Sequence, residues 1–431
     1  MKYRLILFIV FSMLIETVSL QADSGWYSRE NYKPETRIKI TCNNQLNFDR
    51  EDCPIIIPRQ QMPLKNVYQE WFTIVDPSLP PEDDAENGRV IPSQTDDINK
   101  DGIWDELFFM ADFKANEEKT LYVYIGRNTS EIKHFTHAET GSYGRYIVPW
   151  WESEQMGWKL WFPDSADMYG RRGKKLVSNL NLTNIYGHDA PYDAGIDLML
   201  VGKTFGAGGI CLFEEPDLPD SLSRPRFNPY QGKGPFNDAR YACEIIVNGP
   251  LRSIVRAHIM NWRTGQGEYD LDQYFTAYKN KNYYTSRVRY NTFLPEKSDT
   301  VFGCGIRKMP YENECSTGDG FIVSSTDSLR YVITPIEGDP GLKKGVKEYL
   351  GIAMIVKQKY NPQFRATESY EGNYTFRIPV TENLTYEYLA AGAWSEGEIL
   401  TGYNEFKDYI VKTAQEYNNP VDVQIQDVEN K

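Results

Sequence analysis

IPSQTDDINKDGIWDELFF, residues 91–109, carries the most specific chemical pattern in the chain. From Asp97 onward, oxygen-bearing side chains stand at positions one, three, five and nine, and Gly102 stands at position six. This spacing lets a tight turn direct several oxygen ligands at one calcium ion. The predicted metal residues are Asp97, Asn99, Asp101, Ile103 and Asp105.

The residues after this loop decide the kind of fold that carries it. An EF-hand requires a bidentate Glu at position twelve and a helix on each side. Position twelve is Phe108, and the residues LFFMADF that follow the loop are short, aromatic and strand-like. The pattern therefore predicts a structural calcium loop between β-elements. The alternative is an Asx-rich turn, in which Asp and Asn side chains cap their own backbone without a metal.

Strand-like segments recur from Arg37 to Ala391, separated by clusters of Gly, Pro, Asn and Asp. Helical periodicity is clear at Tyr403 to Tyr417, with Phe406 and Ile410 on one face. We therefore predict an all-β fold, a large antiparallel β-sandwich with long loops and one C-terminal helix. The expected segments are a signal peptide at 1–22, an N-terminal β region with the calcium-type loop at 23–140, a main β-sandwich with a candidate glycan site at 141–400, and a C-terminal helix and tail at 401–431.

The N-terminus predicts export. Lys2 and Arg4 precede an apolar run that ends at Ile15, and a small residue, Ala22, follows, as in a secretory signal peptide. No later run approaches the length of a membrane helix, so we expect a periplasmic or cell-surface protein without a membrane span. The net charge of -13 opposes binding to nucleic acid.

Six cysteines in an exported chain permit up to three disulfides. Cys42 with Cys53 and Cys304 with Cys315 are the local pairs, which leaves Cys211 and Cys243. Buried free thiols are the alternative for this last pair.

Polar chemistry is concentrated between Trp150 and Lys203. A carboxylate stands beside two indoles in Trp150-Trp151-Glu152, and DMYGRRGKK, residues 167–175, is a basic cluster in an acidic protein. Such a cluster is able to neutralise the carboxylate of a uronic acid, although a charged run is often only a solvated loop. The segment also contains Tyr169, Arg171, Arg172, His188, Tyr192, Asp193, Asp197 and Lys203.

A second candidate surface is LRSIVRAHIMNW, residues 251–262. Period-two alternation places Arg252, Arg256, His258 and Trp262 on one strand face. Arg256 and His258 are the predicted substrate-binding residues there, and an ordinary solvent face is the alternative. His134 and His137 lie in EIKHFTHAET, which is interpreted as a loop, and are given no role.

Several motifs in order resemble a known family. These are IPSQxDDxNxDGxxDELFFMADF, WES, DMYGRRGKK, GHDxxxDAGIDLMLVGKTFGAGG, NGPLRSIVRAHIMNW and AGAWS before a terminal helix. The chain resembles, from about Ile91 to about Tyr417, the exported domain-of-unknown-function family four-eight-six-one of Bacteroidota. The resemblance implies a galactose-mutarotase-like supersandwich and a carbohydrate-active protein linked to polysaccharide degradation. Its partner would be a polysaccharide or oligosaccharide, with no nucleotide or redox cofactor.

The leading functional hypothesis is a β-eliminating lyase of an acidic, uronate-containing polysaccharide. Elimination needs a neutralised carboxylate and a base within hydrogen-bond reach of the α proton. The predicted roles are base for His188 or Tyr192, acid for Tyr169, neutraliser for Arg171 or Arg172, stacking platforms for Trp150 and Trp151, and substrate binding for Lys203.

Two alternatives remain open. A glycoside hydrolase needs two carboxyl groups, which Glu152 with Asp193 or Asp197 would supply. A non-catalytic glycan-binding protein would use the same tryptophans and arginines without a base. Fold resemblance does not separate these possibilities, because sandwiches of this kind host both activities.

Overall fold

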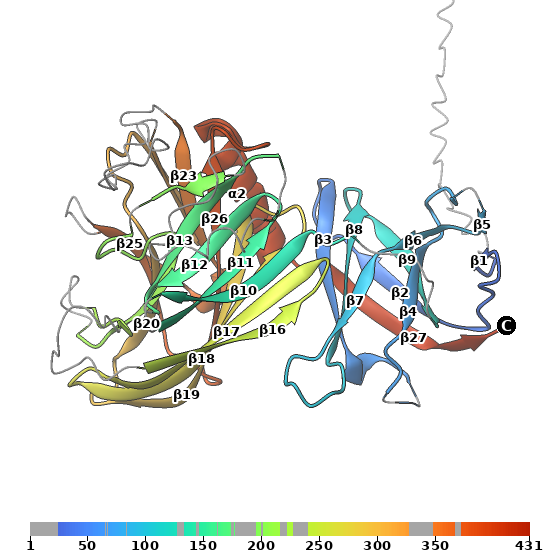
Figure 1. The fold of residues 1–431 in the computed structure, drawn as a ribbon, viewed down its shortest axis with the longest axis horizontal. Coiled ribbons are helices and arrows are strands. Elements are labelled where there is room, and N and C mark those ends of the chain that lie inside the picture. The colour runs from blue at the N-terminus through green and yellow to red at the C-terminus, as the bar shows by residue number, and fades with distance from the viewer. Residues whose placement is uncertain are drawn as a thin grey trace, which may run out of the picture.

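The computed structural model describes residues 25–64, 66, 68–82, 84–126, 133–143, 146–161, 163–173, 176, 195–199, 201–215, 222–226, 240–326, 348–366 and 372–431. In these residues most of the structure is β-strand, arranged in antiparallel sheets with one α-helix near the C-terminus. The prediction of an all-β protein with one C-terminal helix is confirmed at this level. The strands form two units that lie side by side (Figure 1).

The elements are β1 (Ser28–Arg29), β2 (Thr36–Asn43), β3 (Arg50–Pro58), the 3-10 helix η1 (Arg59–Gln61), β4 (Phe72–Asp76), β5 (Ala85–Glu86), β6 (Arg89–Ile91), β7 (Ser93–Asp96), β8 (Glu106–Phe113), β9 (Glu118–Ile125), β10 (Thr136–Tyr143), β11 (Tyr146–Ser153), β12 (Met156–Trp161), β13 (Ser165–Arg171), β14 (Gly195–Asp197), β15 (Gly209–Phe213), β16 (Arg240–Asn248), β17 (Arg252–Arg263), β18 (Gly267–Tyr278), β19 (Tyr283–Pro295), β20 (Val301–Arg307), β21 (Glu314–Gly318), β22 (Phe321–Thr326), β23 (Leu350–Val356), the 3-10 helix η2 (Gln358–Tyr360), β24 (Gln363–Ala366), β25 (Asn373–Ile378), β26 (Thr385–Trp394), α2 (Tyr403–Asn418) and β27 (Asp422–Asn430).

The N-terminal unit is a small sandwich. A sheet in the order β27-β2-β9-β4-β6 faces a sheet in the order β3-β8-β7. Strand β8 is buried on both sides, because alternate residues point to opposite faces of a sheet. Leu107 and Phe109 enter the core of the small sandwich, whereas Phe108 and Met110 pack against the main unit. The strand that follows the calcium-type loop is therefore the joint between the two units.

Strand β27 completes the N-terminal sheet from the far end of the chain. It pairs antiparallel with β2 from Thr36, opposite Asn430, to Asn43, opposite Asp422. In Figure 1 this strand runs from the main unit into the N-terminal unit. The sequence predicts only a tail here, because the short alternating run DVQIQDVEN carries too few apolar residues to identify a strand.

The main unit is built on a large sheet in the order β16-β17-β18-β19-β26-β23-β22-β21. One face of this sheet packs against two smaller sheets, β10-β11-β12-β13-β14 and β15-β20-β25-β24. Val255 and Ile259 of β17, Phe275 of β18 and Trp151 of β11 lie in the shared core. This core fixes which face of each smaller sheet points outward.

A β-bulge in β17 changes the face on which Trp262 lies from the one predicted. Strict alternation puts Trp262 on the outer face with His258, but Trp262 is buried in the main core. The register with β18 shifts between Ile259 and Trp262, and Asn261 has a φ of 53°. An extra residue in one strand reverses the direction of the side chains that follow it.

Helix α2 covers part of the other face of the large sheet. It begins after Gly402, and Phe406, Ile410 and Ala414 are buried on its inner side. They pack against apolar residues of β22, β23 and β26 that include Val323. The predicted helix at Tyr403 to Tyr417 is confirmed. No helix among the described residues has the length and apolar character needed to span a membrane.

The predicted disulfides are absent from the structure, in which all six cysteines are free. Cys304 is buried in the main core on β20, whereas Cys315 is exposed on β21. Proximity in sequence does not bring these two thiols together. Burial raises the pKa of the Cys211 thiol to about 12, which keeps it protonated and unreactive.

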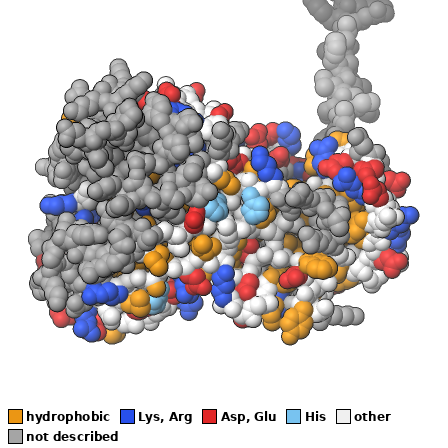
Figure 2. All heavy atoms as spheres, viewed as in Figure 1, with side chains coloured by type: hydrophobic (Ala, Val, Ile, Leu, Met, Phe, Trp, Pro, Cys, Tyr) orange, Lys and Arg blue, Asp and Glu red, His pale blue; other side chains and the backbone are white. Residues whose placement is uncertain are grey.

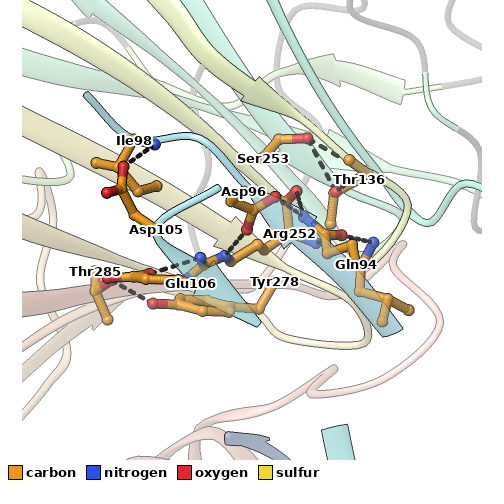
Figure 3. A network of polar contacts seen from close by, with 12 residues as sticks. Gln94, Asp96, Ile98, Asp105, Glu106, Thr136, Arg252, Ser253, Tyr278 and Thr285 are labelled. Atoms are coloured by element: carbon orange, nitrogen blue, oxygen red, sulfur yellow. Dashed lines mark hydrogen bonds and ion pairs between the residues drawn. The ribbon is translucent and has the colours of Figure 1, made fainter. Parts of the chain in front are cut away.

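Arg252 of β17 joins the main unit to the N-terminal unit (Figure 3). Its Nε donates to Asp96 Oδ2 at 2.6 Å, and its Nη2 donates to Glu106 Oε2 at 2.7 Å. Asp96 and Glu106 face each other across β7 and β8 at the two ends of the calcium-type loop. Gln94 also accepts hydrogen bonds from the backbone N–H groups of Leu251 and Arg252. Arg252 is thus buried as an ion-pair partner and is not part of a solvent face.

We expect Arg252→Ala to lower the free energy of unfolding by about 3–5 kcal/mol, because it leaves the buried carboxylate of Asp96 without its cation. The measurement is a urea unfolding curve. The matched control is Arg263→Ala, which removes an exposed pair with Glu268 and is worth about 1 kcal/mol or less. Equal effects of the two substitutions would contradict the assigned importance of the Arg252 pair.

Candidate functional site

Polar side chains gather on the outward face of the β10–β14 sheet. Trp151, Trp158 and Met168 point from this sheet into the main core, so their neighbours along each strand point outward. Direct cross-strand partners then share this face. We call the resulting set the polar face, and it consists of His137, Glu139, Trp150, Glu152, Lys159, Trp161, Asp167, Tyr169, Arg171 and Asp197.

One half of the polar face is an ion pair between Glu152 and Arg171. The Nε and Nη2 atoms of Arg171 lie 3.0 and 2.5 Å from Glu152 Oε2, and both residues are almost fully buried. His137 Nδ1 lies 3.4 Å from the other oxygen of Glu152. Gly157 makes this arrangement possible, because a Cβ there would stand 2.0 Å from Arg171 Nη2. Each oxygen of the carboxylate therefore has a nitrogen partner.

The other half contains two acidic residues beside one amine. Asp167 faces Lys159 directly across β12 and β13, and Asp197 extends the row on β14. Asp167 Oδ2 accepts hydrogen bonds from Trp161 Nε1 at 3.0 Å and from the Tyr169 hydroxyl at 3.5 Å. Lys159 Nζ stands 4.5 Å from the centre of the Trp161 ring.

Burial determines the protonation of this half. It raises the pKa of Asp167 well above the ordinary value, and the nearby Asp197 carboxylate raises it further. Burial lowers the pKa of Lys159 to about 8, although Asp167 and Asp197 act in the opposite direction. Burial also raises the pKa of Tyr169, and the nearby Asp167 and Asp197 raise it further. The Tyr169 hydroxyl therefore stays protonated at neutral pH. Asp167 is therefore placed to hold a proton beside the side chain of Asp197.

Two polar atoms on this face have no hydrogen-bond partner among the described residues. They are Glu139 Oε2 and Trp150 Nε1, and both are shielded from solvent. Glu139 and Trp150 are direct partners across β10 and β11, so the two atoms belong to the same part of the sheet. An acceptor and a donor left unsatisfied side by side are suited to a polar ligand.

The structure brings together Glu152, Tyr169, Arg171 and Asp197 from the predicted catalytic set. Arg172 follows the end of β13 and lies elsewhere, with Nη2 3.6 Å from Glu396 and the guanidinium over the Trp394 ring. His188 and Tyr192 lie outside the described residues, as do Asp193, Lys174 and Lys175. The exposed Lys203 contacts Arg224 through its backbone oxygen.

The expected pair of adjacent stacking platforms is wrong. Neighbouring residues on a strand point to opposite faces, so Trp150 and Trp151 are separated by the sheet. Trp151 stacks on Phe275 in the main core, with ring centres 4.4 Å apart. Trp150 is also fully buried and packs against Tyr169, with ring centres 4.3 Å apart.

Sequence reasoning missed Lys159, Trp161, Asp167 and His137. The signal for the first three was period-two alternation in MGWKLW and SADMYGR, which places them on one face with Tyr169 and Arg171. His137 lies on strand β10 and not in a loop, and it contacts Glu152. The contact of His137 with Glu152 depends on the pairing of β10 with β11, which no local sequence pattern reveals.

The second predicted surface is separate from the polar face. Arg256 and His258 lie on the outer side of the large sheet, on the far side of the main core. Arg256 Nη2 is 2.9 Å from Glu244, and His258 Nδ1 is 2.9 Å from Asp272. Both side chains are partly exposed and paired with carboxylates. The face seen in Figure 2 likewise mixes acidic and basic side chains of the described residues.

The calcium-type loop is held by its own hydrogen bonds. Asp97 Oδ2 accepts from the Gly102 N–H at 2.8 Å, Asn99 Oδ1 accepts from the Asp101 N–H at 2.8 Å, and Gly102 has a φ of 87°. Asp105 Oδ2 accepts from the N–H groups of Ile98 and Asn99. These contacts are those of the Asx-rich turn. In the described part of the chain no three His, Cys, Asp or Glu side chains form a group that would hold a metal. Calcium binding by Asp97, Asn99, Asp101, Ile103 and Asp105 remains a prediction.

Comparison with known proteins identifies the family. The model of the family described as Domain of unknown function (DUF4861) matches residues 42–423, which confirms the resemblance seen in the sequence. No curated protein matches. Similar solved structures include a protein in the Glycosyl Hydrolase Family 38 from Enterococcus faecalis, at 9% identity and a TM-score of 0.47, covering 90% of this chain and 47% of that one. Another is an alpha-mannosidase from Enterococcus faecalis V583, at 9% identity and a TM-score of 0.46, covering 91% of this chain and 46% of that one. The chain thus spans less than half the length of either protein.

We expect the free energy of unfolding to rise with pH between about 8 and 10.5. Burial lowers the pKa of Lys159 to about 8 in the folded protein, whereas the ordinary pKa of a lysine is 10.5. In this range the unfolded chain binds a proton that the folded chain does not, so stability rises by at most roughly 1.4 kcal/mol per pH unit. Lys159→Met should remove this contribution, measured as the difference in unfolding free energy from the unsubstituted protein across the range. Lys33→Met, at an exposed position, is the control. A difference that does not change with pH would contradict the assignment.

If calcium binds the loop, chelation should lower the melting temperature before it alters any activity at saturating substrate, because the ion would be structural. Added Ca²⁺ should restore the melting temperature, and Asp101→Ala should abolish the response to both treatments. A melting temperature that does not change with chelator would show that the loop is an Asx-rich turn without a structural calcium ion.

Proposed function

We propose that this protein, which belongs to the family Domain of unknown function (DUF4861), is a carbohydrate-active enzyme that hydrolyses glycosidic bonds of an acidic, uronate-containing polysaccharide. The observation that carries this proposal is the buried pair of Asp167 and Asp197 beside Lys159. A carboxyl group that keeps its proton next to a carboxylate separates the acid from the base, which is the arrangement that acid–base catalysis requires.

The two carboxyl groups have different roles in the proposed reaction. Asp167 donates its proton to the glycosidic oxygen as the bond from that oxygen to the anomeric carbon breaks. The Asp197 carboxylate either accepts a proton from the attacking water or first bonds to the anomeric carbon itself. Both courses consume one water molecule and release one new reducing end.

Two neighbours orient the acid, and a third lies beside it. Trp161 and Tyr169 donate to the same oxygen of Asp167 and so fix the orientation of the carboxyl group. Lys159 faces Asp167 across the strands, and its ammonium form favours a carboxylate nearby. The unsatisfied Glu139 Oε2 and Trp150 Nε1 supply an acceptor and a donor for sugar hydroxyl groups.

Two observations favour hydrolysis over elimination, the lyase mechanism that is the leading hypothesis from the sequence. Arg171, the predicted neutraliser, already binds both Glu152 and the Gly170 carbonyl oxygen. Tyr169 is a hydrogen-bond donor to Asp167, and its raised pKa opposes ionisation. One observation keeps the lyase as the second candidate: the lowered pKa of Lys159 provides a neutral amine base in mildly alkaline solution.

The test is incubation of the purified protein with a panel of uronate-containing polysaccharides, followed by assays for reducing ends and for ultraviolet absorbance. We expect new reducing ends without absorbance. Asp167→Asn removes the proton donor and should lower kcat by roughly 10²–10⁴-fold. Asp299→Asn, at an exposed position, should leave kcat unchanged.

Other outcomes point elsewhere. Growth of absorbance would identify an unsaturated product and hence the lyase. Retardation in affinity gels with neither signal would identify a glycan-binding protein. Full activity of Asp167→Asn with loss of activity in His188→Ala would move the catalytic centre to the predicted His188.

A further inference from the structure

A cavity of about 270 Å3 lies between the two units, on the opposite side of the main core from the polar face. Its floor is the outer face of the large sheet, which contributes residues such as Tyr274, Tyr278 and Arg287. Its walls are β3, which contributes Arg50, and the end of α2, which contributes Tyr417. The cavity therefore requires both units to be in place.

Every carboxylate that lines the cavity has a cation partner. Glu106 pairs with Arg252 at 2.7 Å, and Glu387 pairs with Lys357. Glu416 lies 4.0 Å from Lys412 on the same helix. The acidic groups of the lining are thus already neutralised (the Arg252 pair is visible in Figure 3).

Two arginines of the same lining, Arg50 and Arg287, form no ion pair among the described residues. Glu387, the cross-strand neighbour of Arg287, is paired with Lys357. Arg50 is 4% exposed, and its Nη1 donates only to the backbone oxygen of Asn419 at 2.9 Å. Its Nε is buried without a hydrogen-bond partner. Burying a guanidinium group without a counter-charge is unfavourable. A ligand carboxylate would remove that penalty.

Arg287 is the exposed arginine of the lining. Its guanidinium lies 4.9 Å from the centre of the Tyr274 ring. Tyr278 is close by on the floor, where its hydroxyl is hydrogen-bonded to Thr285 Oγ1 at 2.9 Å (Figure 3). Aromatic rings beside donors and acceptors offer an apolar surface for one face of a sugar ring and polar groups for its edge.

We infer that this cavity binds a carboxylated saccharide, with Arg50 and Arg287 as the groups that recognise its carboxylates. Arginine suits this role because its planar donors match a carboxylate in two-point contact. The volume lies just below the roughly 300–1,000 Å3 of ordinary small-molecule sites, so it accommodates roughly one or two sugar rings. This site is separate from the polar face and does not depend on the reaction proposed there.

The test is calorimetric titration of the full chain with digalacturonate and diglucuronate, and with the neutral disaccharide galactobiose. At least one uronate should bind, and galactobiose should bind about tenfold more weakly or not at all, because it lacks the carboxylates. Arg287→Gln should weaken uronate binding about tenfold or more. Arg50→Gln should act in the same direction, and the exposed Arg263→Gln is the control.

Arg287→Gln carries the conclusion even if Arg50→Gln lowers stability, because Arg287 is exposed. The inference is overturned if neither uronate binds, if galactobiose binds as tightly, or if Arg287→Gln binds normally. Normal binding by Arg287→Gln together with activity that depends on Asp167 would leave the proposed hydrolase intact. Weakened binding without any activity would support this site while removing the proposed hydrolase.

Discussion

One buried cation links the two units, beside the apolar contacts of Phe108 and Met110. Arg252 belongs to the large sheet, whereas its partners Asp96 and Glu106 belong to the N-terminal unit. A charge withdrawn from water needs its partners at short range, so these three side chains restrict how the units meet at this point. The same contacts hold both ends of the calcium-type loop and form part of the cavity wall. The loop, the interface and the cavity therefore share a single electrostatic constraint.

The polar face follows a different rule. Its strands fill the main core with one set of side chains, and alternation then gathers the remaining set on the outward side. Glu152 and Arg171 compensate each other there, so they contribute a rigid, neutral support. Asp167 and Lys159 are less well compensated, and their pKa values move away from the ordinary range in opposite directions. The shifted pKa values are thus found where the sheet leaves charges incompletely balanced.

Much of the fold was predictable from local patterns. Alternation identified the β class, and the apolar stripe at Phe406 and Ile410 identified the helix. Local patterns failed where the outcome depends on distant partners. The bulge before Trp262 reversed its direction, and β27 is recognisable only by its pairing with β2. All six cysteines are free, and in one of the local pairs Cys304 is buried whereas Cys315 is exposed.

The candidate site was predictable in part for the same reason. Composition located Glu152, Tyr169, Arg171 and Asp197 within one segment, because unusual charges and aromatics stand out in a sequence. It did not select Lys159 or Asp167, whose importance comes from facing each other across two strands. It also treated Trp150 and Trp151 as equivalent, although a sheet separates them.

The pairing of β2 with β27 has a consequence for the biogenesis of the protein. Arg37 and its ion-pair partner Glu429 are 392 residues apart in the chain. At ordinary rates of synthesis, roughly 20 to 80 seconds separate the appearance of the two strands at the ribosome. During that interval the edge of β2 is open to pairing with other strands, since no earlier strand among the described residues occupies it. The first unit to be synthesised is therefore the last to be completed, and a chain interrupted before residue 422 would retain an unprotected edge.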